Sequence, residues 1–209
     1  ADADFRAGTE RYGIAGNGTA YSLFNAPVGL IGYGNLGRAL VPLLRPFTDQ
    51  IAVHDPFLSD AFLEGEGLEP MPLDDLLPTS RFVFLLAGVT SENEGFLTAE
   101  RLAAIPDDAS VILASRAEVV DFKALLGEAQ RGRLRVAIDV FPEEPVPVED
   151  AARQTDNALF SAHLAGGMEA SYARIRAMMI DDVRQILAGL PPMHLQRAEP
   201  RLAAMARSR

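Results

Sequence analysis

The sequence predicts an α/β domain built on a doubly wound parallel sheet, and three observations predict it. Short apolar runs rich in β-branched residues alternate with helical patterns between residues 28 and 188. The first run leads through a glycine-rich turn into the first helical pattern, and polar side chains follow several of the later runs. Strands that alternate with helices pair in parallel, and the helices are then expected to cover both faces of the sheet.

Length and composition limit the class of protein. The 209 residues are enough for one domain with a buried core but few for two, and 48% hydrophobic with 23% charged residues indicates a globular chain. A net charge of −10 disfavours binding to nucleic acid or to an anionic membrane. The absence of Cys excludes disulfides, thiolate metal sites and a thiol nucleophile, and favours a reducing, cytoplasmic location. We predict no metal site.

The first predicted elements lie at the amino-terminal end of the domain. Residues 1–27 show little periodic hydrophobicity, and we interpret them as a connector or a remnant of a second domain. A short β-branched run predicts a strand over 28–32. The spacing of Leu residues predicts a helix over 35–47, in which Pro42 could produce a kink, and a second strand follows over 51–54.

Later runs complete the predicted sheet. Apolar runs predict strands over residues 81–87, 110–114, 134–140 and 157–162, and helical patterns cover residues 99–105, 119–130 and 169–188. The last helix carries an apolar stripe over Ile175, Met178, Met179, Val183, Ile186 and Leu187, and Gly189 ends it. We therefore expect a nucleotide-binding domain over 28–167, an amphipathic helix over 168–190 and a tail over 191–209.

The sharpest motif is the turn between the first strand and the first helix. Residues 32–37 read G-Y-G-N-L-G, which fits the pattern G-x-G-x-x-G. Gly32 allows a tight turn, Gly34 lets a pyrophosphate approach the backbone, and Gly37 lets the helix pack close to the sheet. The amino end of the helix then offers N–H groups and a positive dipole to the phosphates, so the turn predicts a dinucleotide site.

An acidic residue follows the second strand at the distance that such a site requires. Asp55 lies 18 residues after Gly37 and can accept both ribose hydroxyls of adenosine. It would repel a 2′-phosphate, and residues 56–59 offer no Arg to bind one, so NAD is favoured over NADP. Two alternatives stay open: the glycines only make a tight turn, or the turn belongs to a methyltransferase. No P-loop motif occurs.

Three polar residues follow later strands at the edge where open α/β sheets bind ligands. Arg116, Glu144 and His163 come after the strands predicted over 110–114, 134–140 and 157–162. A guanidinium can bind a substrate carboxylate, an imidazole can exchange a hydroxyl proton, and a carboxylate can orient the imidazole. Together they are the set that hydride transfer to a 2-keto acid needs.

Each of these residues also has a plainer interpretation. Arg116 could be a surface cation, Glu143 and Glu144 could form a solvated acidic loop, and His163 could be a structural histidine. His54 is expected to pack within its strand. The functional interpretation depends on the combination rather than on any single residue.

The order of these motifs resembles the D-isomer-specific 2-hydroxyacid dehydrogenase family. The resemblance covers residues 28–190 and includes SRAEVVD, DVFPEEP and SAHLAGG. It implies that Arg116 binds substrate, that His163 is the acid/base with Glu144 as its partner, and that Asp139 holds the nicotinamide carboxamide side. The expected cofactor-binding residues are Gly32, Gly34, Asn35, Leu36, Gly37, Asp55, Ala87, Ser115, Asp139 and Gly166.

Three places depart from the family pattern. The stretch after the fourth strand reads L-A-G-V-T in place of H-V-P-L-T, Leu113 replaces an Asn, and Ala117 replaces a Gly. Residues 1–27 are also too few for the substrate domain that the resemblance implies. We therefore expect this chain to bind NAD but to turn over little substrate by itself.

The resemblance implies an NAD-dependent oxidoreductase that acts on the CH–OH group of a D-2-hydroxy acid, or reduces a 2-keto acid in reverse. It also implies a homodimer formed through the nucleotide-binding domain. A non-enzymatic NAD(H)-sensing or corepressor-like protein of the same fold is the alternative, and a panel of 2-keto acids with NADH would separate the two.

Overall fold

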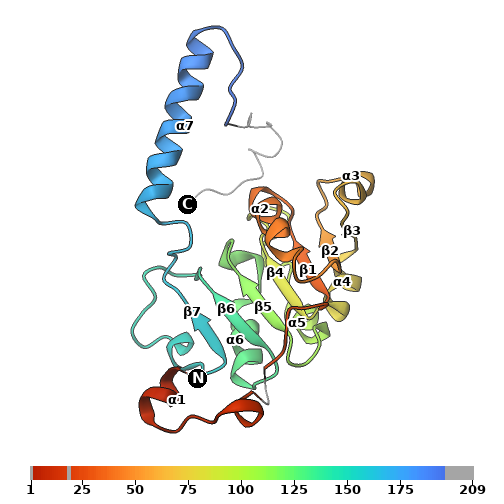
Figure 1. Ribbon diagram of the computed structural model, residues 1–209, viewed down its shortest axis with the longest axis vertical. Coiled ribbons are helices and arrows are strands. Elements are labelled where there is room, and N and C mark those ends of the chain that lie inside the picture. The colour runs from red at the N-terminus through yellow and green to blue at the C-terminus, as the bar shows by residue number, and fades with distance from the viewer. Residues whose placement is uncertain (1, 18–19, 196–209) are drawn as a thin grey trace.

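One parallel sheet organises the chain. The computed structural model describes residues 2–17 and 20–195. Seven strands lie in the order β3-β2-β1-β4-β5-β6-β7, and every pairing is parallel (Figure 1). The strands are β1 Val28–Ile31, β2 Ile51–His54, β3 Glu69–Pro70, β4 Phe82–Leu85, β5 Ser110–Leu113, β6 Arg135–Ile138 and β7 Ala158–Phe160. The predicted doubly wound parallel sheet is confirmed.

Helices connect the strands and extend beyond them. The α-helices are α1 Asp2–Ala7, α2 Asn35–Leu44, α3 Asp60–Gly65, α4 Leu73–Thr79, α5 Ala99–Ala104, α6 Phe122–Gln130 and α7 Glu169–Leu187. Three 3₁₀ turns cover η1 Gly13–Gly16, η2 Ala117–Val119 and η3 Ala151–Gln154. The chain steps outward from β1 to β3 and then returns to β4, so the winding reverses between β1 and β4. Open α/β sheets bind ligands at this point of reversal.

Two hydrophobic cores lie on opposite faces of the sheet. Alternate side chains of a strand point to opposite faces. Val28 and Leu30 of β1 therefore join the core formed with α2 and α3, whereas Ile31 joins the larger core formed with α4, α5 and α6. The second core continues through Val83 and Val111 to the far strands.

The expected cover of both faces holds only in part. Beside β4–β6, the face that α2 covers over β1 carries Phe82, Phe84, Ile112 and Ala137, which are only half-buried. The amino-terminal segment supplies local cover, because the Tyr21 ring packs on Phe82 with ring centroids 5.4 Å apart.

Several short elements were not predicted from the sequence. Helices α3 and α4 have six and seven residues, and β3 has two, so none is long enough to show a hydrophobic period. Helix α2 ends at Leu44 rather than at the predicted residue 47, because Pro46 has no backbone N–H with which to continue the helical hydrogen bonds. Pro42 lies inside α2, as predicted.

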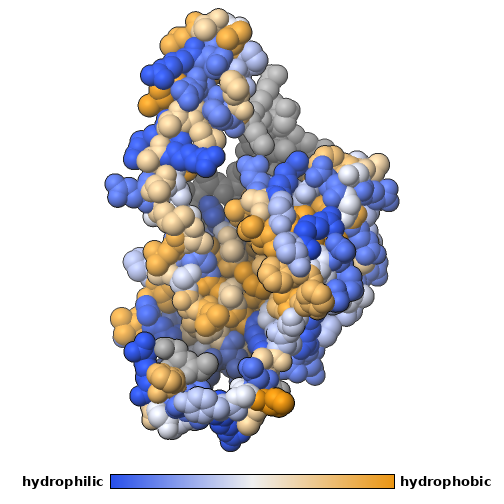
Figure 2. Space-filling model, in the orientation of Figure 1, coloured by the Kyte–Doolittle hydropathy of each residue, from blue (hydrophilic) through white to orange (hydrophobic). Residues whose placement is uncertain are grey.

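Helix α7 projects away from the sheet (Figure 1). The predicted apolar stripe is exposed: Ile175, Met179, Val183 and Ile186 each keep about half of their surface open to solvent. On this face of the molecule, hydrophobic residues gather near the middle and hydrophilic residues cover much of α7 (Figure 2). The predicted tail is described only as far as residue 195, and residues 196–209 lie outside the described part of the chain.

Candidate active site and cofactor site

The glycine turn is shaped by its contact with the neighbouring strand. Gly32 has a φ of +95°, and a Cβ at this residue would lie 2.7 Å from the backbone nitrogen of Ala87. Any larger residue would therefore collide with the chain that leaves β4. Gly37 packs under the turn, where a Cβ would lie 3.0 Å from the Gly32 carbonyl oxygen.

Gly34 serves a different purpose. It caps α2 from an extended conformation, and a Cβ built there would meet nothing within 4 Å. The packing of the chain therefore does not require glycine at this position. Gly34, Asn35 and Leu36 are exposed, and the N–H groups in the first turn of a helix have no intrahelical acceptor. This arrangement leaves room for a phosphate at the amino end of α2.

Asp55 is held rigidly at the end of β2. Its Oδ2 accepts a hydrogen bond from the Tyr33 backbone N–H (2.8 Å), and its Oδ1 accepts one from the Phe57 N–H (3.0 Å). Each carboxylate oxygen can accept more than one hydrogen bond. Asp55 is therefore preorganised, and it retains the capacity to accept ribose hydroxyls.

A pocket of about 760 Å³ lies at the point where the winding reverses. It brings together four of the predicted cofactor residues: Gly32, Gly34, Asp55 and Ala87. His54 lines the pocket too, which corrects the expectation that it only packs within its strand. The sequence did not predict that Pro72, Leu73, Asp74, Val89, Phe96 and Arg101 line the same pocket. Helix α4 was not predicted because its seven residues are too few to show a period, whereas α5 was predicted but not assigned to the pocket.

The predicted acid/base pair is assembled. Nδ1 of His163 lies 2.8 Å from Oε2 of Glu144, and Oε1 of Glu144 accepts the backbone N–H of Phe141 at 3.0 Å. These two hydrogen bonds, chiefly the one from His163, lower the pKa of Glu144. An ionised carboxylate only accepts, so the proton between the pair is assigned to Nδ1.

Arg116 completes the charged groups at this edge. It is exposed at the start of η2, where Nη1 donates to the Ser115 carbonyl oxygen at 2.8 Å. The strands that precede Arg116, Glu144 and His163 are β5, β6 and β7, which are neighbours in the sheet, so the three residues follow the same edge. The structure thus places a guanidinium, a carboxylate and an imidazole together after β5, β6 and β7.

Hydrogen bonds to Asp139 hold the loop that carries His163. Its carboxylate accepts the Leu164 N–H at 2.9 Å, the Ala165 N–H at 3.1 Å and the Ser161 hydroxyl, and its carbonyl oxygen accepts the His163 N–H at 2.8 Å. Burial raises the pKa of Asp139, but these donors outweigh burial and lower it overall. His163 is held with a φ of +54°, and Gly166 follows in exposed backbone.

The residues present fit a bound nicotinamide dinucleotide. Ser115 is 6% exposed, and its hydroxyl has no hydrogen-bond partner among the described residues. A buried hydroxyl without a partner is costly, which suits a site that a ligand completes. Two departures from the family pattern lie away from the pocket lining: Leu113 and Ala117 are buried in the core.

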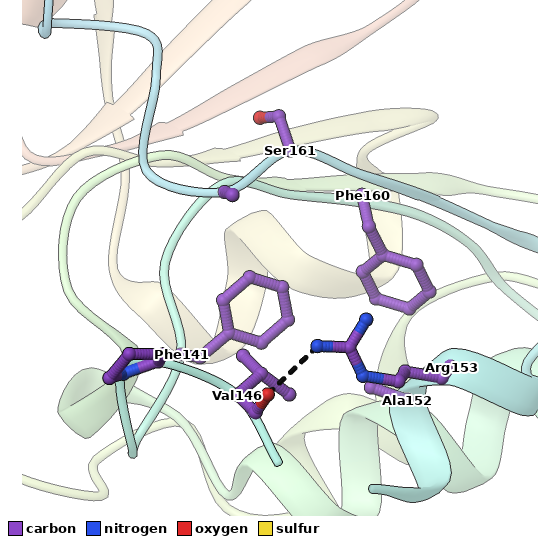
Figure 3. A pocket seen from close by; sticks show the side chains of 8 residues that line it. Phe141, Val146, Ala152, Arg153, Phe160 and Ser161 are labelled. Carbon is purple, nitrogen blue, oxygen red and sulfur yellow. Dashed lines mark hydrogen bonds between the residues drawn. The ribbon is translucent and has the colours of Figure 1, made fainter. Parts of the chain in front are cut away.

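A separate cavity of about 430 Å³ lies beside the Glu144 loop (Figure 3). The Phe141 and Phe160 rings form its walls, and their centroids are 5.9 Å apart. Arg153 reaches into it but is fixed by the carbonyl oxygens of Val146 and Pro147, each at 2.8 Å. This cavity does not include Glu144 or His163.

The fold and the site define a class: a doubly wound α/β domain with a glycine turn at the point of reversal and an arginine, a carboxylate and a histidine at the same edge of the sheet. Residues 2–165 match the family described as D-isomer specific 2-hydroxyacid dehydrogenase, NAD binding domain. The chain belongs to this family. Membership removes the methyltransferase alternative for the glycine turn.

Known proteins agree with this assignment. The chain is 28% identical over 180 residues to a glyoxylate reductase of Korarchaeum cryptofilum, covering 86% of this chain and 54% of the reductase. A phosphoglycerate oxidoreductase structure from Rhizobium etli superimposes with a TM-score of 0.84 at 38% identity, covering 92% of this chain and 62% of that one.

A third relative was solved with a nicotinamide dinucleotide. The D-isomer specific 2-hydroxyacid dehydrogenase of Xanthobacter autotrophicus Py2, in complex with NADPH and MES, is 28% identical with a TM-score of 0.76, covering 96% of this chain and 80% of that one. The chain therefore spans about half to four fifths of the length of these relatives.

Proposed function

We propose that this domain belongs to an NAD-dependent oxidoreductase that interconverts a D-2-hydroxy acid and the corresponding 2-keto acid. The observation that carries the proposal is the 2.8 Å contact between His163 and Glu144 at the sheet edge that also holds the dinucleotide pocket. A sensor needs a pocket but has no need for an oriented acid/base pair. No observation favours the sensing alternative.

His163 moves the proton in this proposal. Its Nε2 takes the proton of the substrate hydroxyl as the alcohol is oxidised, and returns it when the keto acid is reduced. Glu144 receives the Nδ1 hydrogen bond, so its negative charge stabilises the imidazolium that forms. When bound, nicotinamide would accept the hydride from the substrate carbon or return it.

Arg116 orients the substrate. A guanidinium binds a carboxylate through two parallel hydrogen bonds, which fixes the plane of a 2-keto acid. Arg116 is exposed, and among the residues that the structure describes its side chain donates to its neighbour's carbonyl oxygen alone, so its other N–H groups are suited to this contact. We propose that Gly34, Asn35, Leu36 and Ser115 contact the cofactor.

Asp55 supports NAD rather than NADP as the cofactor. Its carboxylate is half-buried at the end of β2 and lines the pocket, where a 2′-phosphate would face a negative charge. Separate titrations with NADH and NADPH test this preference. Tighter binding of NADPH would contradict it.

The acid/base assignment is tested with His163→Ala in the natural protein. We expect turnover to fall by about 10²- to 10⁴-fold, because proton transfer loses its carrier, with NADH affinity almost unchanged. Steady-state kinetics with a panel of small 2-keto acids and a separate NADH titration measure the two effects. Undiminished turnover would overturn the role of His163.

Three further features are part of the proposal. We propose that the protein forms a homodimer through this domain, works in the cytoplasm and binds no nucleic acid, and that residues 28–167 form the nucleotide-binding domain. None of the helices in the described part of the chain is long and apolar enough to cross a membrane. Light scattering of the purified protein tests the dimer.

A further inference from the structure

An ion pair closes the far wall of the dinucleotide pocket. Asp74 lies in the first turn of α4, and Arg101 lies in α5. The Arg101 Nε donates to Oδ1 of Asp74 at 2.7 Å, and Nη2 donates to Oδ2 at 3.2 Å. Both residues line the same pocket as Gly34 and Asp55, yet the proposed chemistry gives neither of them a task.

The order of the strands determines which part of a bound dinucleotide would lie beside Asp74 and Arg101. The glycine turn follows β1, Asp55 follows β2, and Asp74 comes shortly after β3, and these three strands are neighbours in the sheet. A dinucleotide with its pyrophosphate on the turn and its ribose on Asp55 therefore extends its base toward α4. Val89 and Phe96 line the pocket as well and offer the base an apolar contact.

The ion pair keeps hydrogen-bonding capacity for a ligand. Arg101 has five N–H groups. Two bind Asp74 and a third, on Nη1, donates to the Phe96 carbonyl oxygen at 2.7 Å, which leaves two N–H groups without a partner among the described residues. The hydrogen bond from Arg101 lowers the pKa of Asp74, so the carboxylate is ionised and only accepts.

We propose that Asp74 and Arg101 together recognise the edge of the adenine base, given the proposed function that a dinucleotide occupies this pocket. The Asp74 carboxylate accepts from the 6-amino group, and the Arg101 guanidinium donates to the adjacent ring nitrogen. Adenine presents a donor beside an acceptor, whereas hypoxanthine and guanine present an oxo acceptor beside a ring N–H donor. The pair therefore selects adenine over both.

The probe is reduced nicotinamide hypoxanthine dinucleotide, which differs from NADH only at the base edge. Titrations of the chain, followed by nicotinamide fluorescence, measure both dissociation constants without turnover. We expect NADH to bind about tenfold more tightly, the effect of matched against mismatched hydrogen bonds to charged groups that are partly exposed. Asp74→Asn should reduce the preference, because an amide can also donate to the oxo group, although Arg101 still faces the ring N–H of hypoxanthine.

Asp75→Asn is the matched control, since Asp75 lies in the same turn of α4 but does not line the pocket. It should keep the tenfold preference. Should Asp74→Asn fail to fold, Arg101→Lys provides the same test, because an ammonium cannot replace the planar guanidinium.

Two outcomes separate this inference from the function on which it rests. Equal binding of the two dinucleotides by the unaltered chain, or a preference that is undiminished in both Asp74→Asn and Arg101→Lys, would overturn the adenine assignment and leave the cofactor site standing. Failure of the unaltered chain to bind either dinucleotide would contradict the proposed function itself, and the adenine assignment with it.

Discussion

His163 is fixed from three directions. Its backbone N–H donates to the Asp139 carbonyl oxygen, its Nδ1 contacts Glu144, and its backbone has a φ of +54°. Positive φ is uncommon for a residue with a side chain and is retained when its surroundings hold it. Asp139 and Glu144 therefore determine the position of His163 as much as its place after β7 does.

The sequence predicted which residues meet at this point but not how they are held. The ends of parallel strands share one edge, so the order of the strands along the chain was enough to place Arg116, Glu144 and His163 together. The hydrogen bonds that Asp139 accepts from residues 161–165 were not predicted, because they depend largely on the direction of backbone N–H groups, which residue type does not reveal.

Gly32 and Gly34 respond differently to substitution. Gly32→Ala should lower the free energy of unfolding by about 2 kcal/mol or more, because the residue needs positive φ and its Cβ would collide with Ala87. Gly34→Val should leave the melting temperature nearly unchanged but weaken NADH binding at least tenfold, since its side chain would fill the space meant for phosphate. Thermal melts and calorimetric titrations measure the two effects. A Gly34→Val variant that binds NADH normally would contradict the phosphate site.

Asp139 gives stability at this site a pH dependence of known sign. The pKa of Asp139 is lower in the folded chain than the value of about 3.9 expected in the unfolded chain. Its contribution is therefore complete above pH 4 to 5 and is lost as the pH falls through the folded pKa. Asp139→Asn should cost about 2 kcal/mol at pH 7 and flatten the loss of stability in acid. Urea unfolding at several pH values measures both; an unchanged acid slope would contradict the assignment.

Among the elements, the strands were the easiest to predict. The predicted runs over 81–87 and 110–114 contain β4 and β5, because buried parallel strands are apolar almost throughout. The helix predicted over 99–105 is confirmed by α5, whereas α4 was missed because an element of seven residues shows barely two turns. Helices α4 and α5 contribute to the site because the chain returns to the sheet beside the pocket.

Helix α7 is tied to the chain that follows it by one buried carboxylate. Asp182 is 0% exposed and accepts the backbone N–H groups of Met193, His194 and Leu195. Burial raises the pKa of Asp182, and these three donors together hold it below its ordinary value. The segment after α7 is thus folded back against the helix.

Hydrogen exchange can test the contact between Asp182 and residues 193–195. Asp182→Ala should speed hydrogen exchange at Met193, His194 and Leu195 by tenfold or more, because these N–H groups lose their acceptor. Asp181→Ala is the control: it loses only an exposed contact with Arg184 and should leave the exchange rates unchanged. Equal exchange in both variants would show that Asp182 does not hold the segment.

At the scale of the molecule, the alternation of strands and helices was enough to predict the fold, and the glycine turn together with Asp55 predicted where a cofactor would bind. The crossovers between parallel strands are right-handed, and with this rule the sheet has one point where the winding reverses. The incomplete cover over β4–β6 and the exposed stripe of α7 were not predicted, since apolar residues at regular spacing show only that a face is suited to burial.

The central claim is that a nicotinamide dinucleotide lies across the β1–α2 turn with its reactive end between Arg116 and His163. A crystal structure of this chain grown with NADH tests it most directly. We expect a pyrophosphate against Gly34 at the start of α2, a ribose on Asp55 and the nicotinamide ring beside Ser115. A dinucleotide seated instead in the cavity beside Arg153, or no dinucleotide at saturating NADH, would contradict it.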